Sequence, residues 1–195
     1  GYVYPNVYGS AAAQSTASLL GTVVMLIVCA PFASKLAAKF GKKELAVASS
    51  ICSALVWLVC LIWRPASVWG FVACYILANI GMGFFNTIIW AMITDVIDDA
   101  EVRSGIREDG TIYSVYSFAR KLGQAFSSGL VGALLGIIGY TEATAFDPAV
   151  TRGIFNMACI APIIGFVCIV LALVLLAAGY VAYVFIDYHR IGDMS

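Results

Sequence analysis

The chain has 195 residues, of which 62% are hydrophobic and 11% charged, and its mean hydropathy is +0.96. Soluble domains are about 45–50% apolar and about 25% charged, so this composition excludes an ordinary soluble fold and predicts an all-α integral membrane protein. The formal net charge is zero, so nothing in the overall charge favours a nucleic-acid partner.

Five apolar stretches are long enough to cross a bilayer, which takes about 20 helical residues. They run approximately over Thr16–Ala38, Leu45–Trp63, Ser67–Ile93, Thr111–Tyr140 and Gly153–Tyr188. The last three exceed the minimum length, which predicts tilt or helical extension beyond the bilayer. The preceding segment, GYVYPNVYG, is aromatic, uncharged and turn-prone, and we expect it to be an extracellular connection.

Basic residues are distributed unevenly between the connections. One set contains Lys35, Lys39, Lys42 and Lys43 after the first span, Arg103 and Arg107 after the third, and Arg190 after the fifth. The other set contains only Arg64 and Arg152. The positive-inside rule therefore predicts a multi-pass protein of the plasma (inner) membrane, with the N-terminus of this chain outside and its C-terminus cytoplasmic.

The third and fourth spans each have a polar face. On the fourth, Ser114, Ser117, Lys121, Gln124 and Ser128 form a stripe roughly 80° wide, and on the third, Tyr75, Asn79, Asn86 and Trp90 fall within roughly 60°. Amides and aromatic rings suit a sugar, because hydroxyl groups need donors and acceptors while the ring faces stack. Alternatively, the serines and Gln124 bond neighbouring helices, and Tyr75 or Trp90 belongs to an interfacial belt.

Lys121 lies near the middle of the fourth span, where a charged side chain costs roughly 2.5–3.5 kcal/mol on insertion scales. An ammonium group is kept there only if it faces protein, water or a substrate, so the sequence predicts part of a membrane transporter. Arg120 lies about 100° round the helix from Lys121. For Arg120, a structural cation paired with a carboxylate or packed on Tyr116 and a substrate contact are both open.

Catalytic and metal chemistry have little support. The six cysteines lie within apolar stretches with no Cys-x-x-Cys pair, so we expect small core or lipid-facing residues and no metal site. His189 stands alone near the C-terminus, without a nucleophile or a metal-ligating neighbour. We therefore do not expect an enzyme.

Between the third and fourth spans the chain reads ITDVIDDAEVRSGIREDGTIYSVYSFARKLGQAF. This segment resembles the glycoside-pentoside-hexuronide:cation symporters, the melibiose permease family within the major facilitator superfamily. The matching residues, in order, are Asp95, Asp98, Gly105, Arg107, Glu108, Gly110, Tyr113, Ser114 and Lys121. In that register the five spans resemble helices 8–12 of a twelve-helix carrier. Residues 1–195 would then be a C-terminal bundle without helix 7 and the N-terminal half.

The resemblance implies that Lys121 faces carboxylates of the opposite half near a shared sugar and cation site, with Ser117 in the same pocket. The aromatic sugar contact of the family maps to Asn86, and Trp90 follows one turn later. The expected substrate-binding set is Tyr75, Asn79, Asn86, Trp90, Tyr116, Ser117, Lys121 and Gln124. No resident cofactor is expected, and the coupling cation, Na⁺ or H⁺, would bind mainly in the absent N-terminal half.

Residues 94–110 are expected to form a cytoplasmic gating loop. Its charged residues, with the lysines after the first span and basic residues of the missing half, would close an inner gate by ion pairs that break during alternating access. The expected pairing set is Asp95, Asp98, Arg103, Arg107, Lys39, Lys42 and Lys43. The alternative is a solvated loop whose pairs contribute about 0–1 kcal/mol each.

The sequence thus favours cation-coupled symport of a glycoside, pentose, hexuronide or related sugar, with the lipid bilayer, the sugar and the missing half as partners. A carrier of lysolipid or another amphiphile with the same fold is one alternative. A non-transporting membrane scaffold or assembly subunit is another, although it would have to retain Lys121 without a transport pathway.

Overall fold

The computed structural model describes residues 2–192 and is built from helices joined by short connections. The side chains of His189 and Arg190 lie outside the described residues. The elements are α1 (Val3–Tyr8), α2 (Ala11–Val24), the π-helical segment η1 (Met25–Cys29), α3 (Ala30–Phe40), α4 (Lys42–Trp63), α5 (Val68–Ser104), α6 (Asp109–Ile138) and α7 (Pro148–Gly192).

The described residues contain five helical stretches that are long and apolar enough to cross a membrane. These are Ala11–Cys29, Lys42–Trp63, Val68–Ser104, Asp109–Ile138 and Pro148–Tyr180. The prediction of an all-α membrane protein with five spans is confirmed.

The first residues, which we expect to form a turn-prone extracellular connection, contain the short helix α1. Pro5 lies in its first turn, where backbone N–H groups have no partner within the helix, so a proline there costs no hydrogen bond. The Tyr4 ring packs edge-on against Phe71, with 5.5 Å between ring centroids. The Tyr8 hydroxyl donates a hydrogen bond to the Pro65 carbonyl at 2.8 Å. Segment α1 is therefore fastened over one end of the bundle.

The first span is interrupted rather than continuous. Helix α2 changes into the π-helical turn η1, and α3 follows with Pro31 as its second residue. Proline has no N–H to donate and its ring clashes with the carbonyl four residues earlier, so the hydrogen-bond register widens just before it. The apolar length of the sequence does not reveal this change of register.

The prediction of a loop over residues 94–110 is also wrong in its structure. Helix α5 continues to Ser104 and ends at Gly105, whose φ of 72° lies in the left-handed region. Only residues 105–108 connect α5 to α6. The Arg103 side chain pairs with Asp99 one turn earlier at 2.9 Å, an i,i+4 contact that supports a helix. The charged run is therefore largely a helical extension of the third span.

The centre of one core cluster is Phe71, which is 2% exposed. Its ring contacts those of Tyr4, Tyr8, Trp57 and Phe155, with centroid separations between 5.5 and 5.9 Å. These rings come from α1, α4, α5 and α7. One aromatic side chain thus joins four elements at the same end of the bundle.

Helix α5 approaches its neighbours closely at two glycines. A Cβ atom at Gly81 would clash with the Ser53 hydroxyl and lie 2.6 Å from the Ser49 carbonyl oxygen on α4. A Cβ atom at Gly83 would lie 2.6 Å from the Cys29 sulfur. Small residues at helix interfaces permit this approach in membranes, where apolar burial does not drive helices together.

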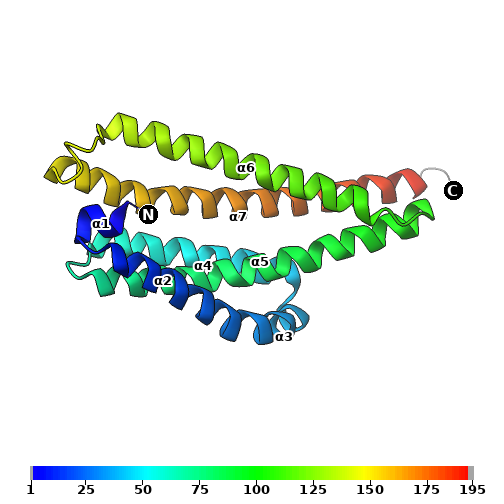
Figure 1. The fold of residues 1–195 in the computed structure, drawn as a ribbon. Helices are drawn as coiled ribbons and strands as arrows, with labels where there is room; N and C mark the ends of the chain where they lie inside the picture. Colours follow the sequence, from blue (N-terminus) through cyan, green and yellow to red (C-terminus); the bar gives the residue numbers. More distant parts are fainter. Residues whose placement is uncertain (1, 193–195) are drawn as a thin grey trace.

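Helix α6 is the least enclosed of the long helices. Figure 1 shows it along one side of the bundle beside α7, whereas α4 lies among α5 and α7. Leu135 is its only buried residue in the described part of the chain. The turn between α3 and α4, the connection between α5 and α6, and the end of α7 all lie toward one end of the molecule (Figure 1). The basic connections are therefore grouped on one side, as the sequence predicts.

Gly81→Ala should destabilise the protein, because the new methyl group must displace the Ser53 side chain and the α4 backbone. Overpacking of this kind costs about 1–3 kcal/mol. The measurement is the thermal unfolding midpoint of the purified full-length protein in detergent. Gly165→Ala is the matched control, since nothing lies within 4 Å of its Cβ position. An unchanged midpoint for Gly81→Ala would contradict the close α4–α5 contact.

Candidate functional site

A groove of about 1040 Å³ lies between α5 and α6. Its lining combines apolar side chains with amides, hydroxyl groups and one guanidinium group. The lining residues are Met82, Phe85, Asn86, Ile89, Tyr116, Ala119, Arg120, Gly123, Gln124, Ser127, Ser128 and Ile169. No carboxylate is among them, so the groove has an amphipathic surface with a single formal positive charge.

The polar lining follows from helical spacing on α6. Tyr116, Arg120 and Gln124 are separated by four residues each and therefore share one face. Asn86 on α5 lines the same groove. The structure thus brings together three members of the predicted substrate-binding set, Asn86, Tyr116 and Gln124.

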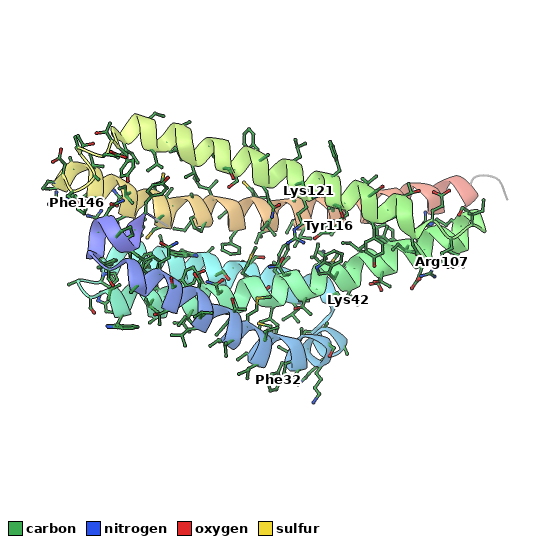
Figure 2. The ribbon with its side chains drawn as sticks, in the orientation of Figure 1. Phe32, Lys42, Arg107, Tyr116, Lys121 and Phe146 are labelled. Atoms are coloured by element: carbon green, nitrogen blue, oxygen red, sulfur yellow. The ribbon has the colours of Figure 1, made fainter. Side chains whose placement is uncertain are left out.

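Trp90 joins the two walls beside this groove. Its ring lies 5.2 Å from that of Tyr116 and 6.0 Å from that of Tyr113, measured between centroids. In Figure 2, Tyr116 extends from α6 toward α5. Trp90 is 42% exposed and is one turn beyond Asn86. It is therefore near the groove without being a lining residue.

Tyr75 and Asn79 lie elsewhere. Both lie next to Gly21 on α2, where a Cβ atom would be 3.3 Å from the Tyr75 ring and 3.8 Å from the Asn79 amide carbon. The Asn79 amide donates to the Tyr75 carbonyl at 2.8 Å. Seven residues separate Asn79 from Asn86, a rise of about 10 Å along α5. The groove therefore does not include these two residues, although all four predicted wall residues are on α5.

Lys121 and Ser117 are exposed residues of α6 that do not line the groove. Arg120 does line the groove. Of the two adjacent cations, the structure therefore places on the groove face the one whose role the sequence leaves undecided. In the part of the chain that the structure describes, neither Arg120 nor Lys121 has a carboxylate within ion-pair distance. The four-residue spacing from Tyr116 and to Gln124 is the pattern that identifies Arg120 as a member of this face.

Arg107 organises the charged connection between α5 and α6. Its guanidinium nitrogens lie 2.7 Å from Glu101 and 3.3 Å from Asp98 on α5, and 3.0 Å from Asp109 on α6. The hydrogen bond to Asp109, followed by the one to Glu101, raises the pKa of Arg107 above its ordinary value. All these groups are partly exposed, so solvent screens each pair and its contribution to stability is small. Arg107 thus connects the two helix ends.

A second ion pair connects α4 to α5. The Lys42 ammonium group lies 2.7 Å from the Asp95 carboxylate and also donates to the Ala91 carbonyl at 3.4 Å. Lys42 and Arg107 lie toward the same end of the molecule (Figure 2). Lys39 and Lys43 have no ion pair among the described residues, and the Lys39 ammonium group lies 5.2 Å from the Phe40 ring centroid. Whether these pairs form a gate stays a prediction.

The described residues contain no cluster of three or more His, Cys, Asp or Glu side chains placed to hold a metal ion. All six cysteines are free thiols. Cys52 and Cys168 are exposed, and the buried ones are Cys29, Cys60, Cys74 and Cys159. The exposed pair bears on any experiment with thiol reagents.

Gln124→Cys should react with a charged, membrane-impermeant thiol reagent if water fills the groove in the full-length protein. The background carries Cys52→Ser and Cys168→Ser. Leu175→Cys is the control, because Leu175 is 70% exposed on an apolar part of α7 and should face lipid. We expect labelling at residue 124 at least tenfold faster than at residue 175. Equal rates would exclude a wet groove.

Comparison with known proteins matches residues 1–178 to the family described as MFS/sugar transport protein. The uncharacterized symporter YjmB of Bacillus subtilis (strain 168) is 40% identical over 56% of this chain and 24% of its own length. The glucuronide carrier protein homolog of Escherichia coli (strain K12) is 29% identical over 74% of this chain and 32% of its own length. A putative sulfoquinovose importer of Escherichia coli (strain K12) is 30% identical over 73% and 30%, respectively.

The chain spans about a quarter to a third of the length of these relatives. No solved structure matches it. The family match covers most of the chain, and the relatives include sugar carriers and symporters. The chain therefore belongs to the MFS/sugar transport protein family, among the glycoside-pentoside-hexuronide:cation symporters.

Proposed function

We propose that the full-length protein containing this chain is a secondary active transporter that moves a sugar or glycoside together with Na⁺ or H⁺. The observation that carries the proposal is the groove between α5 and α6, where Asn86, Gln124 and Tyr116 meet. One relative is a putative glycoside/cation symporter of Escherichia coli (strain K12), and its name supports cation coupling.

The groove has the chemistry that a sugar needs. The amides of Asn86 and Gln124 each offer donors and an acceptor, and Ser127 and Ser128 add hydroxyl groups. The Tyr116 ring, in contact with Trp90, offers an apolar face for the C–H side of a pyranose. Ligand sites usually have volumes of about 300–1,000 Å³, so the groove is large enough for a glycoside.

In this proposal the coupling cation binds mainly in an N-terminal half that this sequence lacks. The groove has no carboxylate, and the acidic residues of the described spans lie at their ends. The exposed Lys121 and Ser117 would face that half near the shared site. Transport would follow from the rocking of the two halves about the site, with the basic end of this bundle on the cytoplasmic side of the inner membrane.

The charged end of the bundle would form the inner gate. The pairs of Lys42 with Asp95 and of Arg107 with three carboxylates hold elements of this chain together. The exposed Lys39 and the partly buried Lys43 are then the groups that would pair with acidic residues of the opposite half. The gate would therefore combine two kinds of ion pair. Those within this bundle would persist during transport, and those between the two halves of the protein would break when the gate opens.

A carrier of lysolipid or another amphiphile is the second candidate. A separate groove of about 340 Å³ between α6 and α7 favours it, because its lining is apolar and could hold an acyl chain. The lining residues are Leu130, Leu134, Ile138, Gly153, Met157, Ile160, Ala161 and Ile164. The polar groove between α5 and α6 favours a sugar. Counterflow in vesicles with a panel of glycosides and a lysolipid distinguishes the two candidates.

Lys121→Ala should abolish coupled sugar uptake by the full-length protein in vesicles and leave membrane insertion intact, because it removes the cation that faces the opposite half. Arg152→Ala is the matched control, since Arg152 is an exposed cation near the start of α7 and should tolerate the change. Wild-type uptake by Lys121→Ala would remove the central role assigned to this residue.

Exchange of the charges of Lys42 and Asp95 tests the proposed inner gate. The single changes Lys42→Asp and Asp95→Lys should each lower the initial uptake rate severalfold, because each replaces the attraction between Lys42 and Asp95 with repulsion between like charges. The double change should restore the rate to within about twofold, because opposite charges again face each other. A partly exposed pair of this kind is worth about 0–1 kcal/mol, so its exact geometry matters little. A double variant as slow as the product of the single effects would show that Lys42 and Asp95 do not act as a pair in transport.

A further inference from the structure

We infer that Arg120 binds an anionic group of the substrate, so that the transported compound is a sugar derivative with a carboxylate or a sulfonate. This inference rests on the proposed function, because it concerns the same groove. It adds a binding residue and the charge of the ligand, neither of which follows from sugar transport alone.

The position of Arg120 requires a partner. Helix α6 covers residues 109–138, and Arg120 is three to four residues from its midpoint, or about 5 Å along the axis. At that depth a guanidinium group without compensating water or charge is costly, whereas at a helix end it could reach the interface. Arg120 is exposed and lines the groove, so any compensating group has to lie there.

The described part of the chain offers no such partner. No carboxylate lies within ion-pair distance of Arg120, and no aromatic ring lies under its guanidinium group. The acidic side chains on α5 beyond the groove have their own cations: Asp95 pairs with Lys42, and Asp98 with Arg107. The groove is therefore left with one uncompensated positive charge.

The neighbours of Arg120 complete a site for an anionic sugar. Tyr116 and Gln124 lie one turn before and after it on the same face, and Asn86 lines the groove from α5. A guanidinium group can donate two parallel hydrogen bonds to a carboxylate or a sulfonate. The neutral amides and hydroxyl groups are then left for the sugar hydroxyls. A singly charged anion thus matches both the charge and the donor set.

The rival explanation is that a carboxylate of the opposite half pairs with Arg120 and that the ligand is neutral. Two pairs of probes separate these possibilities in the purified full-length protein. The first is 4-nitrophenyl β-D-glucuronide with 4-nitrophenyl β-D-glucoside, and the second is 4-nitrophenyl α-sulfoquinovoside with 4-nitrophenyl α-glucoside. Within each pair the sugar is matched and only the charged group differs, so the two anionic members also distinguish a carboxylate from a sulfonate.

For the wild type we expect Kd at least tenfold lower for the anionic member of at least one pair, which corresponds to ~1.4 kcal/mol. Arg120→Gln should weaken that probe at least tenfold and leave its neutral partner within twofold. Arg120→Lys should keep the preference in part, because it keeps the charge. Arg152→Gln, the control, should change neither value.

Equal affinity of the wild type for both members of each pair overturns the inference. Equal weakening of both members by Arg120→Gln does so as well, because it assigns Arg120 to a pair within the protein. If Arg120→Gln does not fold, the test uses the wild type alone. The methyl ester of the glucuronide should bind at least tenfold more weakly than the glucuronide if the anionic group is a carboxylate. The glucoside should bind at least tenfold more weakly than the sulfoquinovoside if that group is a sulfonate. Binding of none of the probes by the wild type contradicts the proposed sugar transport itself.

Discussion

Two consecutive cations near the middle of a membrane helix are the constraint on which the rest of this structure depends. Arg120 and Lys121 differ by about 100° in direction, so no single neighbour can compensate both. Arg120 borders the groove between α5 and α6, and Lys121 is exposed beside it. A charge at this depth is tolerated only against protein, water or ligand, and α6 is the least enclosed long helix here. In the proposed transporter, α6 would therefore face the opposite half of the protein.

The other helices provide the fixed side of the groove. Glycine and serine let α4 and α5 approach closely at Gly81, and the Phe71 cluster joins α1, α4, α5 and α7. Helix α6 meets this unit through few contacts, mainly along α7 and through the Trp90 and Tyr116 rings. The groove therefore lies between a closely packed wall and a loosely packed one. In the proposed transporter, this arrangement would suit a site that opens first to one side of the membrane and then to the other.

Much of the fold could be predicted from the sequence, because apolar length alone determines which segments can cross a bilayer. Helical spacing also placed Gln124 and Ser128 on one polar face, and both line the groove, whereas Lys121 and Ser117 of the same predicted stripe do not. It could not show that α2 covers Tyr75 and Asn79, since periodicity says which residues share a face and not which neighbour packs there. The charged run after Ile93 was expected as a loop because charge excludes it from lipid. Charge does not exclude helix, and the Arg103–Asp99 pair supports one. The π-helical turn before Pro31 likewise depends on local hydrogen bonding that hydropathy does not report.

The most direct test of the central claim is a cryo-electron microscopy structure of the full-length protein in a lipid nanodisc. The account predicts that Arg120 and Lys121 both border a solvent-filled cleft, with the opposite half of the protein across it and no acyl chain in contact with either side chain. A structure in which either charged group lies among the acyl chains would contradict the account.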